Sequence, residues 1–494
     1  MTLVDPSRLH VPPVAHPRPG GEFVLYWLQA TFRAHDNFAL NFAIEQADAL
    51  SVPVLVYHGL RHDYPWASAR LHTWILESVV DLRRDFAAKG IQYAFWLDRS
   101  RGAWTDWPAG RRGSDAAGQD AAADWSPLVH LADRAALVVT DYTPTFIHPR
   151  QLRGLRKRTA TPVIAVDSAT VVPMAAHAKE HSTARGFRTA LLEPLAHHLW
   201  PVPNPLPRVR RPVDVGFEDD APAVTPATIA SLVAGCDVDQ AVAASPMFRG
   251  GTAAGRARLH EFVARGLARY ADDRNDPNNL EAVSRLSPWL HFGNVSIHEV
   301  LLTARAAGPA AAYAKFEDEA VTWRELAHNF CHWNPKHRTV AGIPAWAREQ
   351  LASHEADPRP AHYTLAQLER GDGRPALERD AALLPAGRVD AQLRADAVGE
   401  GGPHVDAGRG RVPGIPGAPQ QQVQPGRAGP EQLRRDHVDV REVRPAVLPA
   451  PHLRDGALPV AQGGGGQVRR AGVHPAVFLT LKRRWGRGPG RLAV

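Results

Sequence analysis

Two stretches of the sequence bring together side chains that could carry chemistry. In the first, Ser284, Arg285 and Ser287 stand just before Pro288 and Trp289, at the mouth of a predicted helix. Hydroxyl groups, an arginine and the free N–H groups of a helix start can together cradle a pyrophosphate. The same residues would also suit an ordinary loop that leads into a capped helix.

The second stretch, residues 316–333, is predicted to be helical and mixes aromatic with polar side chains. Glu325 and Asn329 are four residues apart and therefore share one helical face, between Trp323 and Trp333. A carboxylate and an amide can hydrogen-bond the edge of a base while neighbouring rings stack on it. The alternative is a buried helix with an internal ion pair.

Metal and hydrolase motifs are weaker. The pair His177 and His181 lies at i, i+4, and a second group, His328, Cys331 and His332, clusters further on. Neither group supplies four ligands from one local motif, and the H-E-x-x-H order is missing. A G-x-S-x-G elbow is also missing, so we predict neither a metal site nor a serine hydrolase.

The elements that must position these residues fall into two parts. Between residues 21 and 168, five nearly continuous apolar runs alternate with helical patterns, which is typical of a doubly wound parallel sheet in an α/β domain. Strands are expected at 23–28, 52–57, 91–97, 136–140 and 162–166, and helices at 36–50, 67–89, 126–134 and 147–158, with Asp36 and Ser126 as N-caps. No G-x-G-x-x-G follows the first strand, so the usual dinucleotide fingerprint is absent.

From residue 256 to 370 the strand signals disappear and helical periods take over, so the second domain is predicted to be all-α. Helices are expected at 257–271, 297–306 and 311–329. The domain organisation predicted from these patterns is a disordered N-terminus (1–20), an α/β domain (21–200), an interdomain linker (201–250), a helical domain (251–370) and a low-complexity, disordered tail (371–494).

The tail also changes how the charge is interpreted. The chain holds 58 Lys and Arg against 51 Asp and Glu, but residues 1–370 hold 39 of each, so the whole excess of +7 lies in residues 371–494. That segment has no Asn and no Tyr, and it is rich in Gly and Pro. Such a composition can hardly bury a core. The basic charge therefore says little about a nucleic-acid partner for the first 370 residues.

Composition excludes several other classes. Two cysteines among 494 residues rule out a disulfide scaffold and favour a reducing cytoplasm. The N-terminus has no apolar core for a signal peptide, and no run approaches the roughly 18 apolar residues of a membrane span. We expect a cytoplasmic protein that is a monomer and has no membrane partner.

Five segments, in this order, resemble the DNA photolyase/cryptochrome family, and among its members the class II cyclobutane pyrimidine dimer photolyases. They are YWLQATFRAHDNFAL (26–40), VVTDYTP (138–144), VDSATVVP with AKEHSTARGFR (166–188), RNDPNNLEAVSRLSPWLHFGNVS (274–296) and WRELAHNFCHW (323–333). The resemblance covers roughly residues 21–370, and the RNDP–RLSPWLHFG block is its most specific part.

The resemblance implies a light-driven DNA repair enzyme. In the family, reduced FAD in the helical domain, once excited by light, donates an electron to a flipped-out pyrimidine dimer in DNA, and the cyclobutane ring opens. Carried over by position, Tyr270 and the run Val283, Ser284, Arg285, Leu286 and Ser287 would bind FAD. Glu325 would hydrogen-bond the dimer and stabilise its radical anion, and Asn329 would line the same pocket. A second, antenna chromophore in the α/β domain is common in the family, but no residue here identifies it.

The family pattern stops near residues 368–371. Beyond it, the family continues with helices that complete the flavin site, and this tail does not match them. We therefore hypothesise that the tail is an out-of-frame translation or an unrelated replacement. Two alternatives to repair stay open: a cryptochrome-like photoreceptor without enzymatic activity, and an inactive photolyase remnant that cannot close over FAD. Glu325 favours repair over sensing, because a sensor has no need to bind a dimer.

Overall fold

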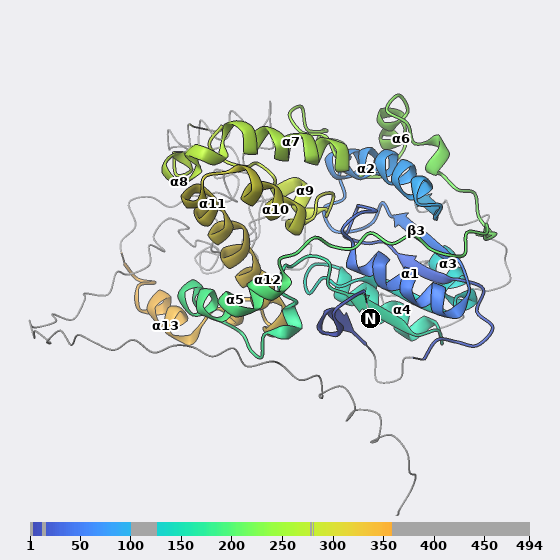
Figure 1. Cartoon of the computed structure of the whole chain (residues 1–494), viewed down its shortest axis with the longest axis horizontal. Coiled ribbons are helices and arrows are strands. Elements are labelled where there is room, and N and C mark those ends of the chain that lie inside the picture. The colour runs from blue at the N-terminus through green and yellow to red at the C-terminus, as the bar shows by residue number, and fades with distance from the viewer. Residues whose placement is uncertain (1–2, 12–15, 100–125, 277–278, 280, 358–494) are drawn as a thin grey trace, which may run out of the picture. The chain divides into compact units, whose positions relative to one another are not determined.

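The computed structural model describes residues 3–11, 16–99, 126–276, 279 and 281–357 (Figure 1). They all belong to the first of two compact units, Met1–His437. The predicted tail, residues 371–494, lies outside the described residues, and so does the second unit, Val438–Val494.

A six-stranded sheet forms the centre of the first part, with strand order β1-β6-β5-β2-β3-β4. The five strands β2 to β6 run parallel, and β1 pairs antiparallel with β6. The strands are β1 (Leu9–His10), β2 (Val24–Trp27), β3 (Val54–Leu60), β4 (Gln92–Leu97), β5 (Leu137–Asp141) and β6 (Val163–Val166). The predicted doubly wound parallel sheet is therefore confirmed, with one short strand added at its edge.

Helices cover both faces of this sheet. One face packs against α1 (Phe38–Leu50) and α2 (Ala69–Ala88), and the other against α3 (Ser126–Arg134) and α4 (His148–Arg158). The start of α1 corrects the predicted N-cap: the Asn37 side chain, not that of Asp36, accepts the N–H of Leu40 at 2.9 Å. Asp36 instead takes a left-handed backbone conformation with φ of 49°, and its backbone N–H is bound by the Asn204 side chain.

Both edges of the set of five parallel strands are covered. At one edge β1 pairs with β6, with Leu9 opposite Val166. At the other edge the predicted linker hydrogen-bonds β4: the N–H of Asp220 donates to the carbonyl of Phe95 at 2.9 Å, and the carboxylates of Asp219 and Asp220 accept N–H groups of the strand. Because exposed strand edges invite association with other chains, this cover protects the sheet. The linker is thus part of the fold, and it includes α6 (Ile229–Ala234).

The structure corrects the expectation of a disordered N-terminus for residues 3–11. A 3-10 turn, η1 (Pro6–Arg8), leads into β1, and the side chain of Arg8 is only 1% exposed. The proline-rich composition was misleading. Pro6 is the first residue of the turn, a position whose N–H would have no partner within the turn, so a proline fits there without the loss of a hydrogen bond.

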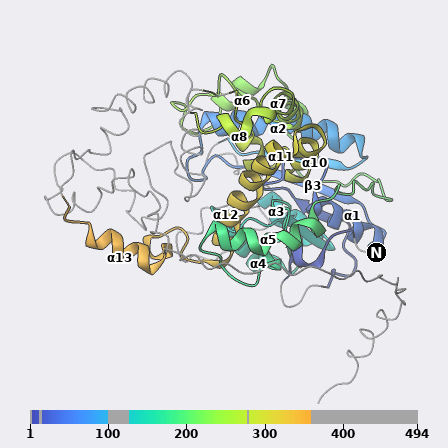
Figure 2. The same cartoon turned by 60° about the vertical axis from the view of Figure 1, so that its left-hand side comes forward.

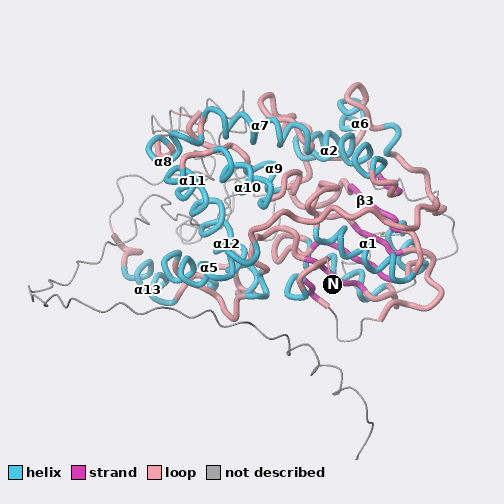
Figure 3. Tube along the Cα trace, viewed as in Figure 1, coloured by secondary structure: helices cyan, strands magenta, loops and turns pink. Residues whose placement is uncertain are grey.

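The second part is helical, as predicted, and its described residues contain no strand (Figure 3). Its helices are α7 (Thr252–Arg265), α8 (Tyr270–Asp273), α9 (Ser287–His291), α10 (Ile297–Ala307), α11 (Ala310–Glu317), α12 (Arg324–Trp333) and α13 (Ala345–Ser353). Helix α5 (Ala184–His198) precedes the linker in sequence, yet its Phe187 and Leu191 are buried in the helical core. In the described part of the chain, no helix has the length and apolar character needed to cross a membrane.

A π-helical segment, η5 (Asp318–Trp323), separates α11 from α12. The sequence pattern predicted one continuous helix over 311–329. A π-helical turn adds a residue and therefore rotates all that follows relative to the preceding helix. The rotation applies to α12, whose polar residues form the candidate site.

Candidate active site at helix α12

Helix α12 buries two polar side chains that are one turn apart. Glu325 is 2% exposed and Asn329 is 1% exposed. Helices α12 and α5 lie side by side in two views (Figures 1 and 2). The structure thus confirms that Glu325 and Asn329 share one face of a helix, and a buried polar face must find hydrogen-bond partners.

Glu325 finds its partners in the backbone of the α/β part. Its Oε1 accepts the N–H of Val171 at 2.5 Å and its Oε2 accepts the N–H of Val172 at 3.2 Å. Burial raises the pKa of Glu325 to about 7, although the two N–H groups and the neighbouring Arg324 oppose the rise. At neutral pH the carboxyl group is therefore poised between its charged and neutral forms.

Asn329 binds the backbone a few residues further on. Its Oδ1 accepts the N–H of His181 at 2.8 Å, and its Nδ2 donates to the carbonyl of Lys179 at 3.1 Å. Asn329 therefore satisfies a donor and an acceptor of the same segment. Together, Glu325 and Asn329 attach α12 to residues 171–181.

The segment bound by Glu325 begins with a turn after β6, which we call the Asp167 turn (residues 167–174). The buried carboxylate of Asp167 accepts four hydrogen bonds of 2.6 to 3.2 Å from within the turn; the donors are the N–H groups of Ala169, Thr170 and Met174 and the hydroxyl of Thr170. Burial alone would raise the pKa of Asp167, but Arg8 and these hydrogen bonds hold it below its ordinary value. The charged carboxylate thus fixes the shape of the turn.

A second contact joins the two parts of the chain nearby. The hydroxyl of Tyr142, just after β5, lies 2.8 Å from Nδ1 of His332 in α12. The ring of His10 stacks on Tyr142 with 3.4 Å between centroids. Burial lowers the pKa of His10 to about 4, so this ring is neutral at physiological pH.

The predicted flavin-binding residues lie in the helical part. Tyr270, at the start of α8, packs its ring against Phe262 and Phe316 in the helical core. Leu286 is fully buried in the same core, which also contains Val171 and Val172. One hydrophobic cluster therefore supports both the predicted flavin run and the amides that bind Glu325.

The run Val283–Ser287 forms a turn that leads into α9. Arg258 fixes this turn by donating to the carbonyls of Ser284 at 2.8 Å and Val283 at 2.9 Å. Arg285 takes a left-handed conformation with φ of 54°, and its guanidinium lies 5.0 Å from the centre of the Phe248 ring. Ser287 is exposed and Ser284 is half-buried. Hydroxyl groups and an arginine therefore stand along one fixed turn, a donor set suited to phosphate.

The sheet has a topological switch point between β2 and β5, where doubly wound proteins commonly bind ligands. Here the carboxylate of Asp141 occupies that position. Its Oδ2 accepts the N–H groups of Gln29, Ala30 and Thr31 at 2.8 to 3.1 Å, and its Oδ1 accepts the hydroxyl of Tyr26. Because Asp141 takes the amides that a phosphate would need, this crevice does not suit a dinucleotide, in agreement with the missing glycine fingerprint.

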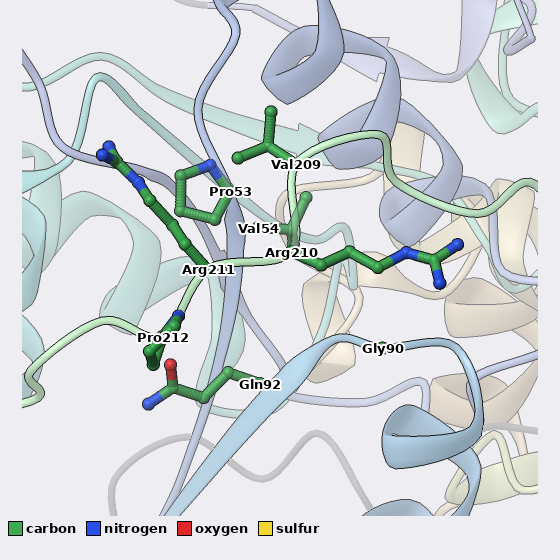
Figure 4. A pocket seen from close by; sticks show the side chains of 8 residues that line it. All are labelled: Pro53, Val54, Gly90, Gln92, Val209, Arg210, Arg211 and Pro212. Carbon is green, nitrogen blue, oxygen red and sulfur yellow. The ribbon is translucent and has the colours of Figure 1, made fainter.

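A surface pocket opens at the N-terminal ends of strands β3 and β4, away from the crevice at Asp141 (Figure 4). It is lined by Pro53, Val54, Gly90, Gln92 and linker residues 209–212. Arg210 and Arg211 point in different directions from the linker in this view. None of the predicted site residues lines the pocket, and we assign no role to it.

Sequence reasoning missed Arg8, Asp167 and Tyr142 as parts of this region. Two signals were available: an arginine within a proline-rich segment, and an aspartate directly after a buried strand. Neither signal identifies a partner, because the partners are distant in sequence.

Comparisons with known proteins identify relatives of this chain. The profile of the DNA photolyase family matches residues 24–208. A deoxyribodipyrimidine photo-lyase of Methanothermobacter thermautotrophicus is 30% identical over 353 residues, which cover 71% of this chain and 70% of the relative. The enzyme of the same name from Potorous tridactylus is 28% identical over 70% of this chain and 60% of its own length. A class III photolyase structure from Agrobacterium tumefaciens aligns over 81% of this chain and 72% of its own, with 17% identity and a TM-score of 0.47.

Proposed function

The chain belongs to the DNA photolyase family, and from this premise we propose that it is a light-driven enzyme that splits cyclobutane pyrimidine dimers in DNA. Relatives named deoxyribodipyrimidine photo-lyase support the reaction class. The class II assignment made from the sequence motifs remains part of this proposal.

The observation that carries the proposal is the buried polar face of α12. Glu325 and Asn329 are nearly inaccessible, yet both are hydrogen-bonded. Burying a carboxyl group costs free energy, and the two hydrogen bonds of Glu325 compensate only part of that cost, because burial still raises its pKa. A carboxyl group with a pKa of about 7 can exchange a proton near neutral pH, so it can respond to charge on a bound lesion.

The described residues fit FAD in its phosphate-binding part. Ser284, Arg285 and Ser287 would hold the pyrophosphate, and the buried ring of Tyr270 would support the wall of the site. Arg258 keeps the turn in place through its two carbonyl contacts. When bound and reduced, FAD supplies the photoexcited electron. A second, antenna chromophore in the α/β part remains a prediction without assigned residues.

Damaged DNA is the proposed partner. Because the first 370 residues carry balanced charge, a DNA-binding face must come from local clustering of cations. Lys179 and Lys336 are exposed. The carbonyl of Lys179 accepts from Asn329, and Asn334, two residues before Lys336, donates to the carboxylate of Glu180 at 3.4 Å. This pair of lysines would meet phosphates close to the proposed lesion site.

The test combines a spectrum with a repair assay. The full chain, purified in the dark, is examined for flavin absorbance, loaded with FAD and then illuminated with an oligonucleotide that contains one thymine dimer. We expect loss of the dimer only in the light. A chain that binds FAD but repairs nothing would instead support a photoreceptor, and one that does not bind FAD would support an inactive remnant.

A further inference from the structure

We propose that Arg8, in the N-terminal segment, is a positioning residue for Glu325 and that it acts through the backbone of the Asp167 turn. The proposal goes beyond the function above and rests on it for its consequence in repair. Arg8 is not placed at the lesion; it holds the peptide groups that hold Glu325.

The contacts of Arg8 carry the proposal. Its Nη1 donates to the carbonyls of Asp167 at 3.1 Å and Thr170 at 2.9 Å, and its Nη2 donates to the carbonyl of Val171 at 2.6 Å. Three of the donors of one guanidinium thus bind three carbonyls of one turn. Only arginine offers several donors in a fixed plane, so lysine would not replace this arrangement.

The turn transmits the position of Arg8 to Glu325 directly. Val171 gives its carbonyl to Arg8 and its N–H to Glu325, and Val172 gives its N–H to the other carboxylate oxygen. Residue 171 is therefore held from both sides. If Arg8 is removed, the turn loses three hydrogen bonds, and the two N–H groups are then held less firmly, by the Asp167 carboxylate and by packing alone.

The surroundings of Arg8 keep the guanidinium itself in place. Its carbon Cζ lies 3.8 Å from the centre of the Phe38 ring in α1. The buried carboxylate of Asp167 compensates its charge: Arg8 is the cation that lowers the pKa of Asp167 most, and Asp167 is the carboxylate that most opposes the lowering of the Arg8 pKa by burial. A buried arginine that is stacked, charge-balanced and hydrogen-bonded to backbone is pre-organised.

The first test measures the coupling without any repair reaction. Hydrogen exchange of a peptide that covers the Asp167 turn is compared in the wild type, Arg8→Ala, Arg8→Lys and Glu325→Gln. We expect all three variants to speed exchange at Val171 and Val172, each by about ten-fold or more. Arg156→Ala is the matched control, because Arg156 donates to the carbonyls of His10 and Val163 but does not contact the turn. Unchanged exchange in Arg8→Lys, or equal acceleration in Arg156→Ala, would overturn the proposal.

The second test is a double-mutant cycle in the repair assay. Introduced into the wild type, Arg8→Lys should lower the repair yield about ten-fold. Introduced into the Glu325→Gln variant, it should change the yield less than about two-fold, because both substitutions disrupt the same path from Arg8 through the Asp167 turn to Glu325. Additive losses would show that Arg8 acts independently of Glu325. A wild-type chain without repair would contradict the proposed function, while the exchange experiment would still decide the role of Arg8.

Discussion

The carboxyl group of Glu325 should make the unfolding free energy of this chain depend on pH, and the substitution Glu325→Gln should abolish that contribution. Its pKa lies at about 7 in the folded chain, against an ordinary value of 4.5. At about 1.4 kcal/mol per pKa unit, the folded state favours the protonated form by roughly 3 kcal/mol. Because the folded-state pKa is raised, this stabilisation is fully present below pH 4.5 and is lost as the pH rises through 7.

Glu325→Gln removes the titration and leaves a constant cost. Glutamine keeps one acceptor oxygen, but its amide group faces the second backbone N–H, which then lacks an acceptor and costs about 1 to 3 kcal/mol. The unfolding free energy of the wild type should therefore be higher than that of the variant, and the difference should be largest at pH 4.5. That excess should shrink by roughly 3 kcal/mol toward pH 8 and can change sign.

Urea unfolding of both proteins, followed by tryptophan fluorescence between pH 4.5 and 8, measures the difference. Buried histidines such as His58, whose pKa burial lowers to about 3, act in the opposite sense, but they are common to both proteins and cancel. Glu349→Gln, at an exposed position of α13, is the control for removal of one carboxylate. A difference between wild type and Glu325→Gln that stays constant with pH would refute the reasoning.

Three further substitutions test other contacts. Asp141→Asn should lower the unfolding free energy by about 2 to 3 kcal/mol, because an amide cannot accept from three N–H groups and a hydroxyl in the same geometry; urea unfolding checks this. Asn329→Ala leaves the N–H of His181 and the carbonyl of Lys179 without their partner and should lower the midpoint of thermal unfolding, by an amount equivalent to about 1 to 2 kcal/mol. Ser287→Ala should weaken FAD binding about five-fold in a fluorescence titration without changing the stability of the FAD-free chain, because its side chain is exposed.

The strands and their order of appearance could be predicted because residues buried on both faces give continuous apolar runs. Strand β3 extends to Leu60, beyond the predicted end at residue 57, since His58 and Gly59 interrupt the apolar run but not the pairing. Strand β1 could not be found, because two residues carry no periodic pattern.

Of the candidate site, the residues of helix α12 could be predicted from the sequence, but their hydrogen-bond partners could not. A spacing of four residues placed Glu325 and Asn329 on a common face, and burial confirms that face. Their partners are backbone groups of residues 171–181, and no side-chain type in the sequence announces which backbone amide will be used. The π-helical segment before α12 was also hidden, because it depends on hydrogen-bond spacing rather than on composition.

The position of Arg8 also sets an order of events during synthesis of the chain. Its three carbonyl partners lie 159, 162 and 163 residues downstream. At about 5 to 20 residues per second, the ribosome needs on the order of 10 to 30 seconds to produce them. Until then the guanidinium cannot make these three contacts, while strands that are already synthesised can pair. The N-terminal segment therefore docks late, and it closes onto a sheet whose β6 is already made.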